Sequence, residues 1–139
     1  MRNSEVKFLR IKMSQASHAS NGRIYHVPLE AITSVVKSPA ANDSTPATLV
    51  INYTSGGSNN VITATTSDVG TKAQLDEAIG AFETELLNAI DIANNGSKNV
   101  VRVPWSEGNM FESLIDASKL PAGMLGTESD NTKTKISHS

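Results

Sequence analysis

Residues 71–94 read TKAQLDEAIGAFETELLNAIDIAN and predict one amphipathic helix between two regions rich in β-forming residues. Thr71 and Gln74 stand three positions apart, as in a capping box, where both side chains bond free backbone N–H groups. Apolar residues recur at spacings of three and four and form a continuous stripe. This stripe comprises Leu75, Ala78, Ile79, Phe82, Leu86, Ile90 and Ala93. Gly96 is predicted to end the helix, because glycine adopts the left-handed conformation at little cost.

The regions on either side of this helix alternate apolar and polar residues, as strands with one buried face do. The predicted strands are Val6 to Met13, Arg23 to Leu29, Ile32 to Lys37, Thr48 to Thr54, Val61 to Thr66 and Asn99 to Trp105. Pro28 lacks an N–H group, so a strand that bends there and resumes at Ile32 would turn the corner of a small barrel. Ser55 to Asn60 predicts a hairpin with a long, flexible loop.

Together these elements predict an α+β fold that is mainly β, with the helix packed on a small, strongly bent antiparallel sheet or barrel of five to six strands. The predicted domain covers residues 1–105, and residues 106–139 form a C-terminal extension. The extension combines a short helix over about 107–118 with a polar tail over 119–139. Such a tail is disordered in isolation, so an ordered one would be held by a neighbouring subunit or a lattice contact.

The composition excludes several classes of function. The chain has 139 residues, a formal net charge of −2 and no cysteine, so it has no thiolate nucleophile and no zinc–thiolate site. His18, His26 and His138 lack the short spacings of metal ligands. No catalytic, cofactor or metal residue is predicted, and neither a signal peptide nor a transmembrane segment is expected.

Two groups of residues are candidates for contacts with partners. Trp105 and the apolar side of the short helix could form a protein interface, since tryptophan is enriched at buried interface centres. The interface candidates are Trp105, Met110, Phe111, Leu114 and Ile115. The alternative is a nucleic-acid surface made by Arg10, Lys12 and Arg102, although few aromatic residues accompany these cations.

Five segments carry a resemblance to known proteins. They are VKFLRIKM (6–13), YHVPLEAITSV (25–35), the Thr-rich hairpin LVINYTSGG (49–57) with VITATT (61–66), QLDEAIGAFETELLNAI (74–90) and NVVRVP (99–104). Their pattern and order over residues 1–105 resemble small uncharacterised virion-associated proteins of marine tailed bacteriophages. The resemblance implies an Sm-like or SH3-like small barrel of the kind that serves as a ring, neck, tail or decorating subunit in virions.

The leading hypothesis is therefore a non-enzymatic assembly subunit, located in the virion or the host cytoplasm. Its partners would be further copies of the chain or other virion proteins, with no small-molecule substrate and no membrane. Removal of residues 106–139 is expected to leave the fold intact and to weaken assembly. The second hypothesis is an Sm-like module that binds single-stranded RNA, and an uncharacterised enzyme is the third.

Overall fold

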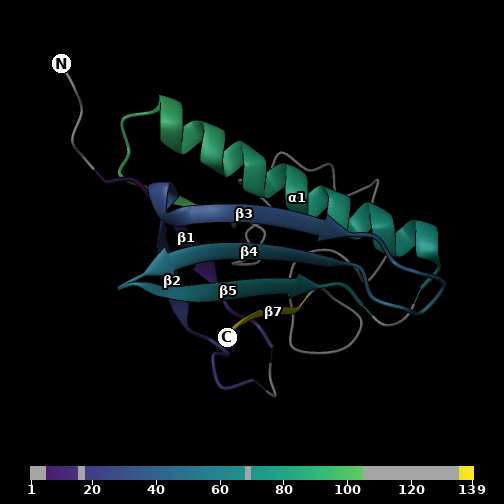
Figure 1. Cartoon of the computed structure of the whole chain (residues 1–139). Coiled ribbons are helices and arrows are strands. Elements are labelled where there is room, and N and C mark those ends of the chain that lie inside the picture. The colour runs from purple at the N-terminus through teal and green to yellow at the C-terminus, as the bar shows by residue number, and fades with distance from the viewer. Residues whose placement is uncertain (1–5, 16–17, 68–69, 105–134) are drawn as a thin grey trace.

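A computed structural model describes residues 6–15, 18–67, 70–104 and 135–139 of the chain (Figure 1). These residues form seven strands, one α-helix and one turn of 3-10 helix. The strands are β1 (Phe8–Lys12), β2 (Ile24–Pro28), β3 (Ile32–Ser38), β4 (Thr48–Ser55), β5 (Ser58–Thr65), β6 (Val100–Arg102) and β7 (Lys135–His138). The helix α1 spans Lys72–Asn95. The chain is α+β and mainly β, which confirms the predicted fold class.

The strands lie in two sheets, where one bent sheet was predicted. The first has the order β2-β1-β6 and the second the order β3-β4-β5-β7. β1 and β6 are parallel, whereas every other pair is antiparallel. A parallel pair requires a long crossover connection, and here the crossover includes β2, the strands β3, β4 and β5 of the second sheet, and α1. The expectation of a purely antiparallel sheet was therefore wrong.

The chain passes from the first sheet to the second at Pro28. β2 ends at this proline, the 3-10 turn Leu29–Ala31 follows, and β3 begins at Ile32. The Leu29 N–H group bonds the carbonyl of Lys7 at 2.9 Å, so the bend is anchored to the start of β1. The prediction of a corner between Pro28 and Ile32 is confirmed.

The hairpin of β4 and β5 is tighter than predicted. Ser55 pairs directly with Ser58, so Gly56 and Gly57 alone make the turn. Both glycines have positive φ, +59° and +83°, as a type I′ turn requires. The right-handed twist of the paired strands favours this two-residue turn. Asn59 and Asn60 therefore belong to β5 rather than to a long, flexible loop.

The start of α1 is as predicted and its end is not. Gln74 donates its N–H to Thr71 Oγ1 at 3.2 Å, and the Thr71 N–H bonds Gln74 Oε1 at 3.0 Å, which confirms the capping box. Gly96 follows the helix with φ −102° and ψ −178°, which is extended rather than left-handed. Glycine is needed there for another reason, because a Cβ would lie 2.7 Å from the carbonyl oxygen of Ile92.

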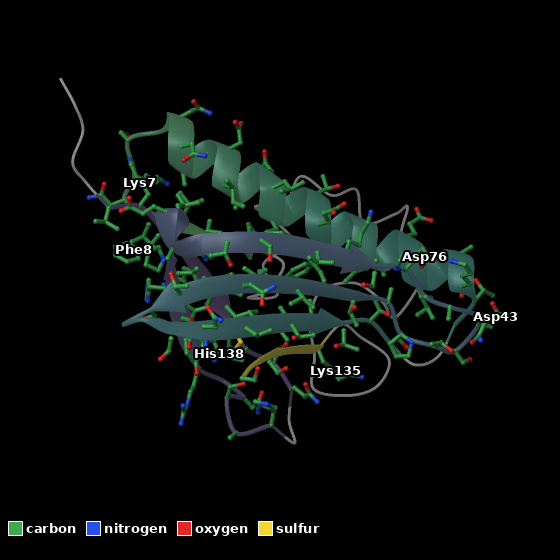
Figure 2. The ribbon with its side chains drawn as sticks, viewed as in Figure 1. Lys7, Phe8, Asp43, Asp76, Lys135 and His138 are labelled. Atoms are coloured by element: carbon green, nitrogen blue, oxygen red, sulfur yellow. The ribbon has the colours of Figure 1, made fainter. Side chains whose placement is uncertain are left out.

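Hydrogen bonds to residues elsewhere in the chain hold both ends of α1, and Figure 2 labels Asp43, Asp76 and Lys7, which make them. At the N-terminal end, Asp43 Oδ1 accepts the Lys72 N–H at 2.7 Å, and Asp76 Oδ1 accepts the N–H of Ala40 at 2.7 Å. The Lys72 ammonium and the Ala40 N–H lower the pKa of Asp76. Beyond the C-terminal end, Lys7 Nζ donates to the carbonyls of Gly96 and Lys98, each at 3.1 Å. The charges match the polarity of the helix dipole.

One core joins the helix to both sheets. α1 runs alongside β3 and also contacts β1, β4 and β6 (Figure 1). The largest fully buried side chains are Leu9, Ile11, Met13, Leu49, Ile51, Ile62, Leu75, Ile79, Phe82, Leu86 and Ile136. Ile136 lies on β7, so the end of the predicted polar tail is held by the chain's own sheet. The short helix predicted over 107–118 lies outside the described residues. The predicted domain boundary at residue 105 lies at their limit, since the description stops at residue 104 and resumes at residue 135.

Candidate functional site

Only some of the residues proposed as contact sites lie in the part of the chain that the structure describes. Trp105, Met110, Phe111, Leu114 and Ile115 lie outside the described residues. Arg10 and Arg102 are directly opposite one another in the parallel ladder of β1 and β6.

Lys12, the third proposed cation, lies at the end of β1, opposite Ile24 of β2 and exposed. The two arginines therefore face one another across the ladder, and Lys12 lies two positions along β1 from Arg10, on the same side of that strand.

Arg10 and Arg102 line a pocket of about 340 Å³ between α1 and the β1–β6 ladder. Lys98 adds a third cation, and Glu85 of α1 contributes a carboxylate from a residue that is only 1% exposed. The pocket is thus basic overall but contains an acid. Sequence spacing could not reveal it, because the two arginines are 92 positions apart and come together through the parallel pairing.

The outer side of the four-stranded sheet forms a second candidate surface, here called the outer face. Register and alternation place on it Ser34, Val36, Ser38, Thr48, Val50, Asn52, Val61, Thr63, Thr65, Lys135 and Ser137. Val36, Val50, Thr63 and Ser137 form one row across all four strands, and Val36 is 49% exposed. Lys135, at one corner, is the only charged residue among them.

A third feature is a cluster of rings around the end of β7, which sequence patterns did not predict. His138 stacks on Tyr25 of β2, with ring centroids 4.0 Å apart and planes inclined by 9°. His138 Nε2 lies 2.6 Å from the hydroxyl of Tyr53 on β4. Ser20 Oγ accepts the backbone N–H of His138 at 3.1 Å and lies 2.8 Å from His18 Nδ1.

Burial changes the acidity of two members of this cluster. It lowers the pKa of His138, with a smaller contribution from the nearby His18, and it raises the pKa of Tyr53, with a contribution from Tyr25. Both shifts favour the neutral forms, which share a hydrogen bond. Ser20, which bonds both His18 and the backbone of His138, is 3% exposed. The cluster joins β7 to β2 and β4.

Within the described residues, no group of three or more histidine, aspartate or glutamate side chains could hold a metal ion. In that part of the chain, no helix is both long enough and apolar enough to cross a membrane. No family model matches the chain, and comparisons with curated proteins and with solved structures found no similar protein.

Proposed function

We propose that this chain is a non-enzymatic assembly subunit that binds a second copy of itself through the outer face. The observation that carries the proposal is that, among the described residues assigned to this face, only Lys135 carries a charge. Protein surfaces usually carry many charged side chains, whereas the centres of protein interfaces are depleted in charged side chains. A broad face with one charged residue, one exposed valine and two half-buried valines is therefore suited to contact with another protein.

A second copy is the partner that this surface fits best. In a twofold contact each residue near the axis meets the same residue of the partner. A charged side chain there would therefore be repelled by the identical charge on the partner. The outer face avoids this repulsion, because Val50, Asn52 and Thr63 occupy its middle strands and Lys135 lies at a corner. Copies with a net charge of −2 can meet there without placing like charges together.

The test is the mass of the full chain in solution, measured by light scattering after gel filtration. We expect a discrete oligomer for the unchanged protein and a lower mass for Val50→Lys at the same concentration, because the lysine places an ammonium group in the middle of the face. Ala73→Lys is the matched control, because it adds the same charge at an exposed position of α1. A monomeric unchanged protein, or a Val50→Lys variant that keeps its mass while folded, would contradict the proposal.

Following the resemblance to virion proteins of tailed phages, we further propose that this assembly belongs to a phage particle. Other virion proteins would then be additional partners, and the chain would occur in the virion or the host cytoplasm. Mass spectrometry of purified particles is the direct test. The chain should be found at a fixed ratio to the major capsid protein after washing with high salt.

The second candidate function is binding of single-stranded nucleic acid, and the position of the two arginines favours it. Arg10 and Arg102 lie side by side with Lys98 nearby, so three cations meet at one place. We expect retention of a short oligonucleotide at low salt, and a weaker salt dependence for Arg102→Gln. Lys72→Gln is the control, because it removes one cation from the far end of α1. No retention at low salt would exclude this function.

A further inference from the structure

The last strand, β7, lies in a slot that is bounded on both sides by hydrogen-bonding groups. We propose that this slot is a strand-binding site and that it takes the Lys135–Ser139 segment of a second copy in place of the chain's own. Such an exchange would link copies through their C-terminal segments. The inference goes beyond the proposed contact through the outer face and does not depend on it.

One side of the slot is the edge of β5. Lys135–His138 pairs there with Ile62–Thr65 in antiparallel register. Ser139 continues the ladder, since its N–H bonds the Val61 carbonyl at 2.9 Å and its carbonyl accepts the Val61 N–H at 3.4 Å. The ladder supplies affinity for an extended segment, as in strand addition to a sheet edge.

The connection between β1 and β2 forms the other side of the slot. The Ser14 N–H bonds the carbonyl of Ile136 at 2.8 Å, and Ser20 Oγ accepts the His138 N–H at 3.1 Å. A strand in the slot therefore bonds on both edges. Only a segment in one register and direction satisfies both sets of groups.

Side chains give the slot its selectivity. Ile136 is fully buried in the common core, and His138 lies between Tyr25 and Tyr53. The slot thus recognises an aliphatic residue followed, two positions later, by a flat ring that accepts or donates a hydrogen bond. Figure 2 shows Lys135 and His138 at opposite ends of β7, with His138 beside the other strands.

Each of these contacts is made by the segment 135–139 itself, so it is the same whichever copy supplies the segment. Exchange of an identical element is a low-cost route to association for this reason. The connection to β6 is also long enough. Residues 105–134 could extend over roughly 100 Å, which exceeds the distance between neighbouring domains in contact.

Cysteine cross-linking of the full chain tests the exchange, because the natural sequence has no cysteine. Thr63 and Ser137 lie directly opposite in the ladder, so their Cβ atoms are about 5 Å apart. Thr63→Cys and Ser137→Cys are made as separate proteins, mixed, and treated with a short thiol–thiol cross-linker. Both carry Val50→Lys, which removes contact through the outer face. We expect a Thr63–Ser137 cross-linked heterodimer whose yield rises with protein concentration.

Val36→Cys mixed with Ser137→Cys is the matched control. Val36 is on the outer face, 49% exposed and three strands away from β7. Exchange predicts a yield several-fold lower than for the Thr63 pair, whereas random collision predicts an equal or higher yield. Equal yields for the two mixtures would overturn the proposal.

A chain with both Thr63→Cys and Ser137→Cys separates the remaining outcomes. An intramolecular cross-link in dilute solution shows that β7 is seated in its slot. If that link forms and the mixture still gives no heterodimer, exchange is excluded. Absence of the intramolecular link would exclude the slot itself. Neither result changes the comparison of masses for the unchanged protein and Val50→Lys, so the two proposals fail independently.

Discussion

At the scale of single residues, Gly96 makes a close backbone contact with Ile92 that a larger side chain would disturb. Its N–H bonds the Ile92 carbonyl at 2.8 Å, and an added Cβ would come within 2.7 Å of that oxygen. Gly96→Ala must therefore shift the backbone where the chain leaves α1. We expect the free energy of unfolding to fall by about 1–3 kcal/mol, the cost typical of overpacking. Urea unfolding at neutral pH measures it.

Gly80 provides the control with the opposite sign. It lies in the middle of α1, and a Cβ there would meet nothing within 4 Å. Gly80→Ala should raise the free energy of unfolding by about 0.5–1 kcal/mol, because alanine loses less conformational entropy in a helix. The same sign for both variants would show that helix propensity, rather than the contact with Ile92, governs Gly96.

The ring cluster predicts how stability depends on pH. Burial and His18 lower the pKa of His138 in the fold from about 6.5 in the unfolded chain. The unfolded state therefore binds the proton more readily. The free energy of unfolding should be level between about pH 7.5 and about pH 8 and should fall as the pH drops through about 6.5 towards the lowered pKa. Urea unfolding between pH 8 and pH 5.5 measures this profile.

His138→Phe removes the titrating group but retains a ring that can stack on Tyr25. Its profile should be flatter below pH 7, and at pH 8 it should be less stable by about 1 kcal/mol, because the hydrogen bond to Tyr53 is lost. His26→Phe is the control, since His26 is exposed on β2. A profile of His138→Phe as steep as that of the unchanged protein would contradict the assignment.

At the scale of elements, β7 contributes to the stability of the sheet. Ile136 is fully buried, so Ile136→Ala should lower the free energy of unfolding by about 2–5 kcal/mol. Ser137→Ala, one position along on the outer face, should change it by less than about 0.5 kcal/mol. Equal shifts of the urea midpoint for both variants would show that β7 is not part of the core. Because β7 belongs to the sheet and Ile136 to its core, removal of residues 106–139 is expected to weaken the fold, which replaces the expectation from the sequence that the fold would stay intact.

The elements that the sequence predicts well are those whose signals are local. The capping box and apolar stripe of α1 depend on neighbours three and four positions away, and the alternation of Leu49, Ile51 and Tyr53 marks a buried strand face. β7 escaped prediction because it has one large apolar residue and is stabilised by β5, which is distant in sequence. The length of the hairpin loop was overestimated because polar Asn59 and Asn60 are typical of loops as well as of solvated strands.

The candidate sites were harder to predict than the elements, because they arise only from the arrangement of the whole molecule. Arg10 and Arg102 meet through a parallel pairing, and Tyr25, Tyr53 and His138 meet where three strands converge. Alternation places each of these residues on one side of its strand. The alternation pattern does not say which strands are neighbours, and both candidate sites depend on which strands are neighbours.

The shared core leads to a prediction about cooperativity. Leu9 of β1, Leu49 of β4, Phe82 of α1 and Ile136 of β7 belong to one buried cluster. Neither sheet has a core of its own, so neither should remain folded when the other unfolds. We expect one two-state transition in urea. The circular dichroism of α1 in the far ultraviolet and the near-ultraviolet signal of the aromatic residues, which include Tyr25 and Tyr53 in different sheets, should follow the same curve.

Ile136→Ala makes this test more stringent, because it alters β7 alone. If the core is shared, both signals should move together to a lower urea concentration and remain coincident. Loss of the helical signal before the tyrosine signal would instead mean that α1 unfolds independently of the sheets. In that case the contacts of α1 with β1, β3, β4 and β6 would be too weak to couple the helix to the sheets, and α1 would have to be regarded as a separate unit.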